Sequence, residues 1–340
     1  MKSRLARANS KGKHLKALAL LSGGLDSALA AALLTKEGVD VEAVFFHHPF
    51  YPSKSKSRLQ AEDVAESLNI RLKTIKLEEL IEVVKKPKHG YGRGLNPCID
   101  CRIFMLKKAK KHAKKISASL IITGEVLDER PMSQHRRALD LIEKESGLEG
   151  RILRPLSAKL LPETEAERRG LIDRDKMLDI RGRPRRRQLE MAKDLSIIGY
   201  ASPAGGCLLT EKPFVKKLKD LFKNTENVTA RNIELLKTGR HFRKGRNKIV
   251  VGRDEDENTK LLNMKGNRDY YFEVPECGSP TTLLLGPKSK EAIETAASLT
   301  AYYSDNKNDQ TIVAYGIKRL DKTIDVHRIS EEEINKLRVA

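Results

Sequence analysis

The chain has 340 residues, of which 39% are hydrophobic and 33% are charged, a composition typical of a globular protein with two or three domains. No apolar stretch approaches the roughly 20 residues of a membrane-spanning helix, so no membrane partner is expected. Four cysteines do not make a disulfide scaffold, which favours a reducing, cytoplasmic location. The formal net charge is +20 and favours a polyanionic partner, most often nucleic acid, over a merely soluble lysine-rich surface.

Short apolar runs alternate with helical patterns along the first 125 residues. The predicted strands lie at 15–21, 39–48, 70–77 and 118–125, and the predicted helices at 27–38, 57–69 and 101–115. Such alternation predicts an α/β fold with a doubly wound parallel sheet.

Beyond about residue 145 the pattern becomes irregular and basic, and then two helices are predicted over 213–238. After these helices the chain favours strands, with one helix at 288–302 and a final strand pair near 311–327. We therefore expect a basic leader at 1–14, a first domain at 15–238 and a smaller α+β domain at 239–340.

The segment SGGLDS at 22–27 lies directly between the first predicted strand and the first helix. Glycines at this junction allow a tight turn whose N–H groups point at phosphate oxygens, and the helix N-terminus adds partial positive charge. Ser22 and Ser27 can donate hydroxyl hydrogen bonds, and Asp26 can orient Mg²⁺. An ordinary turn in which Ser27 caps the helix is the alternative.

Two cysteines, Cys98 and Cys101, follow a glycine-rich loop and open a predicted helix. Alone, this pair fits half a zinc site, a redox pair or part of an iron–sulfur site. Cys207 lies in a loop of small residues and supplies a third thiol. Three cysteines without a fourth favour a 4Fe–4S cluster with one open iron over zinc, for which His89 or His112 would complete the ligands.

The loop 22–27 resembles the PP-loop of ATP pyrophosphatases, which bind ATP and release pyrophosphate while they adenylate a substrate. Together with the CxxC pair and a later single cysteine, it resembles the iron–sulfur-dependent tRNA thiolases of that superfamily. This resemblance implies that Cys98, Cys101 and Cys207 bind the cluster and take part in catalysis.

The segment TGEVLD at 123–128 resembles the TGxxLD motif of the same group, which lines the nucleotide site. The motif implies that Asp128 is catalytic, and Glu129 is a departure because close relatives often carry a second aspartate there. Phe46 ends the second strand, where such proteins place adenine. The residues expected to hold ATP and Mg²⁺ are Ser22, Gly23, Gly24, Asp26, Ser27, Phe46 and Gly124.

Residues 249–307 resemble the NFACT-R domain, an RNA-binding module also found in ribosome quality-control proteins. The segment YYFEVPECGSP departs from this module, which usually has a Trp-His pair there. Cys277, within this segment, is expected to be a plain small residue.

Basic residues are dense on the helix after the CxxC pair, in the arginine run 181–187 and in the run 240–246. Each of the first two runs alone is typical of a solvated face, but together they predict a groove for a tRNA backbone. The run 240–246, which includes an aromatic residue, is expected to be a separate RNA contact. The residues expected to contact RNA are Lys107, Lys111, Arg185, Arg186, Arg187, Arg240 and Arg243.

These resemblances imply an ATP-dependent tRNA sulfurtransferase that adenylates a uridine carbonyl and replaces its oxygen with sulfur. The expected partners are tRNA and a sulfur donor, which would be sulfide, a cysteine desulfurase or a sulfur carrier, and a homodimer is left open. Two alternatives are a PP-loop ligase acting on another substrate and an RNA-binding adaptor of ribosome quality control. The complete SGGLDS segment speaks against the adaptor.

Overall fold

The structure is a computed structural model that describes residues 15–51, 57–200 and 207–340. Within these, a first compact unit contains 15–48, 57–92 and 96–200, and the remaining residues form a second unit. The predicted leader at 1–14 lies outside the described residues. No helix among the described residues has the length and apolar character needed to cross a lipid bilayer.

The first unit is built on five parallel strands in the order β3-β2-β1-β4-β5. The strands are β1 (Lys16–Leu20), β2 (Asp40–His47), β3 (Leu72–Lys76), β4 (Leu120–Thr123) and β5 (Ile152–Leu153). In β1, the residues after Lys16 are all buried, because parallel sheets are covered on both faces and their strands are continuous apolar runs. The four strands predicted over residues 15–125 are therefore confirmed.

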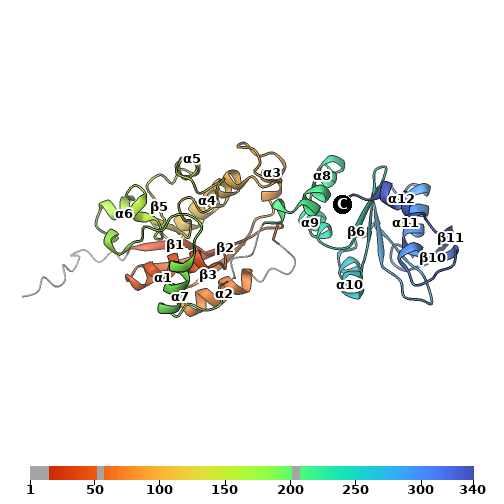
Figure 1. Ribbon diagram of the computed structural model, residues 1–340, viewed down its shortest axis with the longest axis horizontal. Helices are drawn as coiled ribbons and strands as arrows, with labels where there is room; N and C mark the ends of the chain where they lie inside the picture. The colour runs from red at the N-terminus through yellow and green to blue at the C-terminus, as the bar shows by residue number, and fades with distance from the viewer. Residues whose placement is uncertain (1–14, 52–56, 201–206) are drawn as a thin grey trace, which may run out of the picture. The chain divides into compact units, whose positions relative to one another are not determined.

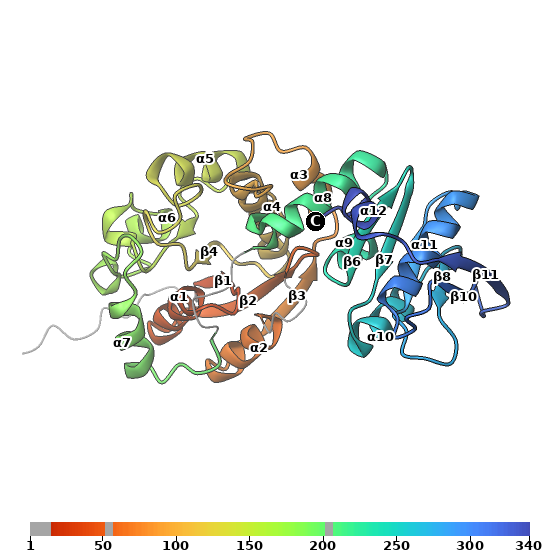
Figure 2. The same cartoon turned by 45° about the vertical axis from the view of Figure 1, so that its right-hand side comes forward.

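Helices cover both faces of this sheet, as Figures 1 and 2 show. One face carries α1 (Leu25–Lys36), α2 (Ser57–Ser67) and α7 (Arg186–Asp194), and the other carries α3 (Leu80–Lys85), α4 (Cys98–Lys115) and α5 (Arg136–Ser146). This arrangement confirms the doubly wound α/β fold. The strand order reverses between β1 and β4, so the loops after these two strands flank a topological switch point, where such sheets bind ligands.

The second unit contains a six-stranded antiparallel sheet in the order β11-β10-β8-β9-β7-β6. Its strands are β6 (Arg240–Lys244), β7 (Asn247–Val251), β8 (Tyr270–Glu273), β9 (Thr282–Leu285), β10 (Gln310–Gly316) and β11 (Lys322–His327). The helix α11 (Lys290–Tyr303) packs on one face through buried alanines (Figure 2). On the other face, Leu261 of α10 (Glu255–Met264) packs against Val250 and Leu283. These strands and helices confirm that the C-terminal part of the chain has the predicted α+β fold.

Two helices predicted from the sequence, α8 (Lys212–Asn224) and α9 (Ala230–Leu236), belong to the second unit. Asp220 of α8 accepts hydrogen bonds from Arg243 at 3.0 Å and from Lys248 at 2.8 Å, and both donors are on the sheet. The compact unit therefore begins before the domain boundary expected at 238–239. The last helix, α12 (Glu331–Leu337), and the short α6 (Glu165–Arg168) were not anticipated, and neither were α3, α5 and α10. The expectation of one helix after residue 238 was therefore wrong.

Candidate active site

The loop 22–27 turns from β1 into α1 through hydrogen bonds of its two serines. Ser27 Oγ donates to the carbonyl oxygen of Gly24 at 2.8 Å and accepts from the N–H of Ser22 at 3.2 Å. Gly23 has a φ of +78°, a conformation that favours glycine. Gly24 is the N-cap of α1, and no side chain caps the helix there. The first-turn N–H groups thus fit an anion, and Ser27 braces the loop instead of capping the helix.

Gly124, directly after β4, touches this loop. A Cβ atom added at Gly124 would lie 2.4 Å from the backbone nitrogen of Ser27 and 2.5 Å from the carbonyl carbon of Asp26. Real Cβ atoms do not approach backbone so closely, so only glycine permits this contact. The TGxxLD segment and the PP-loop therefore lie side by side at the switch point, as the resemblance implied.

Arg185 lies against acidic residues of both loops. Its Nη2 atom is 3.6 Å from Oδ2 of Asp26, and its Nε donates to Oε1 of Glu129 at 3.2 Å. Burial, and then the charge of Glu129, raises the pKa of Asp26 to about 6, although Arg185 acts in the opposite direction. The arginine predicted as an RNA contact is thus part of the wall of the candidate nucleotide site.

Asp128 is held by the same basic segment. Its φ is +62°, and Arg181 Nε donates to its Oδ2 at 2.7 Å. The backbone of Gly182 donates to the carbonyl oxygen of Leu127 at 2.7 Å, so residues 181 and 182 run alongside the TGxxLD loop. Sequence reasoning missed this pairing, since more than 50 positions separate the partners.

The CxxC pair occupies the first turn of α4. Cys98 and Cys101 are both partly exposed and form no disulfide, and Asn96 Nδ2 donates to Cys98 Sγ at 3.3 Å. Asp100, between them, accepts the N–H groups of Lys88 and His89 at 3.1 and 3.0 Å, which fastens the preceding loop to the helix.

The two histidines considered as zinc ligands face carboxylates. His89 Nε2 lies 3.2 Å from Glu145, and His112 Nε2 lies 3.3 Å from Glu42. Across the described residues, no group of three His, Cys, Asp or Glu side chains is placed to hold a metal ion. Cys98 and Cys101 belong to the first unit and Cys207 to the second, so a shared cluster stays a prediction.

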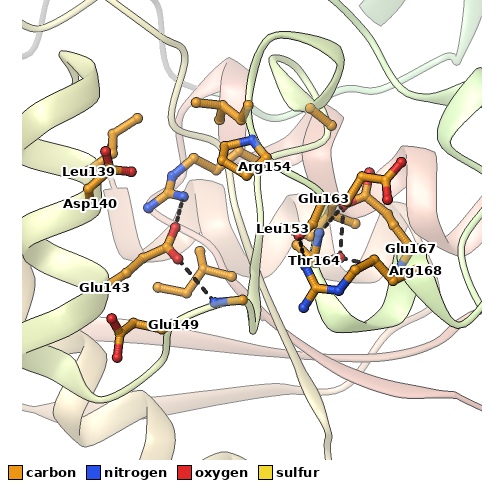
Figure 3. Close-up of a pocket in the computed structure, with 15 residues that line it drawn as sticks. Leu139, Asp140, Glu143, Glu149, Leu153, Arg154, Glu163, Thr164, Glu167 and Arg168 are labelled. Carbon is orange, nitrogen blue, oxygen red and sulfur yellow. Dashed lines mark hydrogen bonds and ion pairs between the residues drawn. The ribbon is translucent and has the colours of Figure 1, made fainter.

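A buried ion-pair network ties α4 to the loop after β4. Glu125, with a fully buried side chain, lies 2.8 Å from Arg102 and 2.9 Å from Arg154, and it accepts from Thr123 Oγ1 at 3.0 Å. Burial alone would raise the pKa of Glu125, but the two arginines bring it below its ordinary value. Figure 3 shows Arg154 also paired with Glu143, at the wall of a cavity of about 300 Å³. None of these pairs was predicted.

Phe46 is almost fully buried near the end of β2. Its expected role beside adenine stays a prediction.

The residues expected to contact RNA differ in whether they already form contacts with other side chains of the protein. Lys107 and Lys111 are exposed on α4, and neither forms an ion pair or hydrogen bond within the described part of the chain. Arg186 pairs with Glu190, Arg187 with Asp179 and Arg243 with Asp220, while Arg240 lies over the ring of Tyr303 at 4.5 Å. Their roles in RNA binding remain predictions.

Two family models match the chain in separate regions. Residues 12–159 match "Thiamine biosynthesis protein (ThiI)", and residues 239–338 match "NFACT protein RNA binding domain". These matches confirm the two resemblances drawn from the sequence, a PP-loop region of the thiouridine-synthase type and a C-terminal NFACT-R region.

Similar proteins match about a third of the chain. A "Probable tRNA sulfurtransferase" of Thermoanaerobacter sp. (strain X514) is 36% identical over 122 residues, 34% of this chain and 30% of the relative. A "tRNA-specific 2-thiouridylase MnmA" of Leptospira biflexa is 34% identical over 125 residues, 32% of this chain and 33% of the relative. The chain thus spans about a third of the length of these relatives.

Two solved structures are more distant. A 4-thiouridine synthetase–RNA complex with bound ATP has a TM-score of 0.42 and 22% identity, covering 66% of this chain and 53% of that chain. The U34-tRNA thiolase NcsA from Methanococcus maripaludis, with its [4Fe-4S] cluster, has a TM-score of 0.36 and 15% identity, covering 66% and 71%.

Proposed function

We propose that the protein is an ATP-dependent tRNA sulfurtransferase that adenylates a uridine carbonyl oxygen and then replaces this oxygen with sulfur. The observation that carries the proposal is the contact of Gly124 with the backbone of Ser27, which joins the phosphate loop to the TGxxLD segment. Relatives that match about a third of the chain are named as probable tRNA sulfurtransferases, and this supports the same chemistry.

In this proposal the loop 22–27 binds the phosphates of ATP, with Mg²⁺ on Asp26, through uncapped N–H groups of α1 and the hydroxyl of Ser22. The uridine oxygen attacks the α-phosphorus, and the bond from this phosphorus to the bridging oxygen breaks, so that pyrophosphate leaves. Fixed N–H dipoles stabilise the charge that develops on pyrophosphate. Asp128, fixed by Arg181, orients the uridine at the end of β4.

Sulfur at the oxidation level of sulfide then attacks the activated carbon, AMP leaves with the former uridine oxygen, and a thiocarbonyl forms. A 4Fe–4S cluster on Cys98, Cys101 and Cys207 would supply an open iron that holds this sulfur. Two partly exposed thiols one helical turn apart fit one edge of such a cluster.

One hydrogen bond within the second unit supports the involvement of Cys207. Leu95 N–H donates to the carbonyl oxygen of Leu209 at 2.9 Å. Leu95 precedes Cys98 by three residues, and Leu209 follows Cys207 by two. Within the second unit, residues 93–95 therefore lie beside the segment that follows Cys207.

The second unit would contribute RNA binding, in keeping with its match to the NFACT RNA-binding model. The net charge of +20 and the exposed Lys107 and Lys111 on α4 fit a tRNA backbone as the polyanionic partner. We place this reaction in the cytoplasm, where tRNA and a sulfur donor such as a cysteine desulfurase meet.

Mass spectrometry of tRNA nucleosides from a deletion strain tests this proposal. We expect one thiouridine to disappear and to return when the wild-type chain is supplied. Return with a Cys98→Ala chain would show that thiolation does not need Cys98. An unchanged set of thiouridines in the deletion strain would contradict the proposal and favour a ligase that acts on another substrate. RNA binding by the purified protein without conversion of ATP to AMP would support the adaptor.

A further inference from the structure

Arg185 differs from the other arginines of the run 181–187 in its surroundings. Its side chain is 22% exposed, whereas that of its neighbour Arg186 is 92% exposed. Arg185 is the N-cap residue of α7, and α7 packs against α1, the helix that follows the PP-loop. The fold therefore turns this one arginine inward to the phosphate loop.

Arg185 contacts two acidic residues, Asp26 and Glu129, and among the described residues it is the only cation within ion-pair distance of either. Arg130 acts on Asp26 from farther away. Its guanidinium lies 3.6 Å from Asp26 and also pairs with Glu129, whose side chain is 8% exposed. One guanidinium thus contacts two largely buried carboxyl groups. A triphosphate entering this loop would add several negative charges beside them, and the electrostatic cost must be offset by a cation.

The PP-loop itself has no lysine, unlike phosphate loops that end in Gly-Lys-Ser or Gly-Lys-Thr. Among the residues that the structure describes, Arg185 is the basic residue that forms an ion pair with the loop 22–27. A guanidinium is planar and always charged, and it binds phosphate through two parallel hydrogen bonds.

We propose that Arg185 is a phosphate-binding residue of the nucleotide site, which exchanges its contact with Asp26 for phosphate oxygens of ATP. Glu129 keeps the guanidinium in place during this exchange and is a positioning residue. The inference rests on the proposed function only in that the loop 22–27 binds ATP. It removes Arg185 from the expected RNA contacts.

The test compares Arg185→Gln with Arg183→Gln, which removes the same charge from the same run. Arg183 is exposed and forms no ion pair with the PP-loop within the described residues. Dissociation constants for ATP and for AMP are measured by titration calorimetry, and tRNA affinity is measured over a range of salt concentrations.

We expect Arg185→Gln to weaken ATP binding about 10- to 100-fold, as loss of a hydrogen-bonded charge does, and to weaken AMP binding much less. Arg185→Lys should recover part of the ATP affinity. Arg183→Gln should leave ATP binding within about twofold of the wild type, because a surface charge outside the site changes little.

Arg185→Gln alone leaves the carboxylate of Glu129 without its ion-pair partner, which could disturb folding. The double variant Arg185→Gln/Glu129→Gln removes this unpaired charge and serves as the control for misfolding. It should fold and still bind ATP weakly. Wild-type ATP affinity in either Arg185→Gln variant would overturn this inference and leave the proposed function standing. A tRNA salt dependence reduced by Arg185→Gln, with ATP binding unchanged, would assign this arginine to RNA. Failure of the wild-type protein to bind ATP would overturn both proposals.

Discussion

The Oε1 atom of Glu125 lies 2.8 Å from Nε of Arg102, the residue that follows Cys101 on α4. Glu125 in turn follows Gly124, whose backbone touches the PP-loop at Ser27. One buried carboxylate thus connects the loop that we propose binds ATP with the helix that carries the CxxC pair. Because both ends are fixed, the cysteines and the nucleotide loop keep a defined spacing within the first unit.

Replacement of Glu125 by Gln should lower the free energy of unfolding by about 3–5 kcal/mol, because buried Arg154 and half-buried Arg102 lose their shared partner. Urea unfolding followed by circular dichroism measures this change. Glu190→Gln is the matched control, since Glu190 pairs with Arg186 at the surface, and it should cost less than about 1 kcal/mol. Equal effects of the two substitutions would show that the Glu125 network does not stabilise the fold.

Two glycines of the site should respond differently to alanine. Gly124→Ala forces a Cβ atom against the backbone of Ser27, so we expect loss of both stability and ATP binding. At Gly24 a Cβ atom meets nothing closer than Ser22 Oγ at 3.5 Å, so Gly24→Ala should keep its thermal midpoint. It should nevertheless bind ATP more weakly, because the added methyl group enters the phosphate cradle. ATP binding by Gly24→Ala as tight as that of the wild type would show that the phosphates do not bind at the loop 22–27.

The raised pKa of Asp26 predicts a pH dependence of stability. Its pKa of about 6 in the folded chain exceeds the ordinary value of 3.8, so the folded state binds a proton more tightly than the unfolded state. The contribution of Asp26 to stability therefore falls by about 2–3 kcal/mol as pH rises from about 4 to about 6, and it is constant above this range.

Asp26→Asn should remove this fall. The measurement is the free energy of unfolding at about pH 4 and about pH 7, in the wild type and in the variant. The decrease between the two pH values should be smaller in the variant. An identical decrease in both proteins would contradict the shifted pKa.

Alanine at Cys98, Cys101 or Cys207 should abolish the visible absorbance of a reconstituted cluster and the formation of thiouridine. ATP binding should persist, since none of the three thiols contacts the loop 22–27 in our proposal. Cys277→Ala is the control and should change neither property, because Cys277 packs beside the core of the second unit. Full absorbance in Cys207→Ala would leave the CxxC pair with a different third ligand.

Lys107 and Lys111, one turn apart on the exposed side of α4, should contribute to tRNA binding. Each phosphate contact that is lost should reduce the slope of log affinity against log salt by about 0.7–0.9. We therefore expect a clearly smaller slope for Lys107→Gln/Lys111→Gln, measured by filter binding. Lys108→Gln is the control, because Lys108 already pairs with Glu79. Equal slopes in the wild type, the double variant and the Lys108→Gln control would show that Lys107 and Lys111 do not contact tRNA.

Much of the fold could be read from local patterns. Apolar runs such as 15–21, with a glycine turn and a helical period behind them, predicted the strands around the PP-loop. The resemblance of residues 123–128 to the TGxxLD motif placed Gly124 beside the loop 22–27. These signals span a few residues each, so the sequence alone determined the α/β fold and the position of the loop 22–27 between a strand and a helix.

Only the tertiary structure decided what the charged side chains do. The partner of Arg185 at Glu129 is 56 positions away, and the partner of Arg154 at Glu125 is 29 positions away. An arginine-rich run has the same local pattern whether it faces solvent, RNA or a buried carboxylate. The choice depends on which elements the fold brings together, because a buried charge is stable only beside an opposite one.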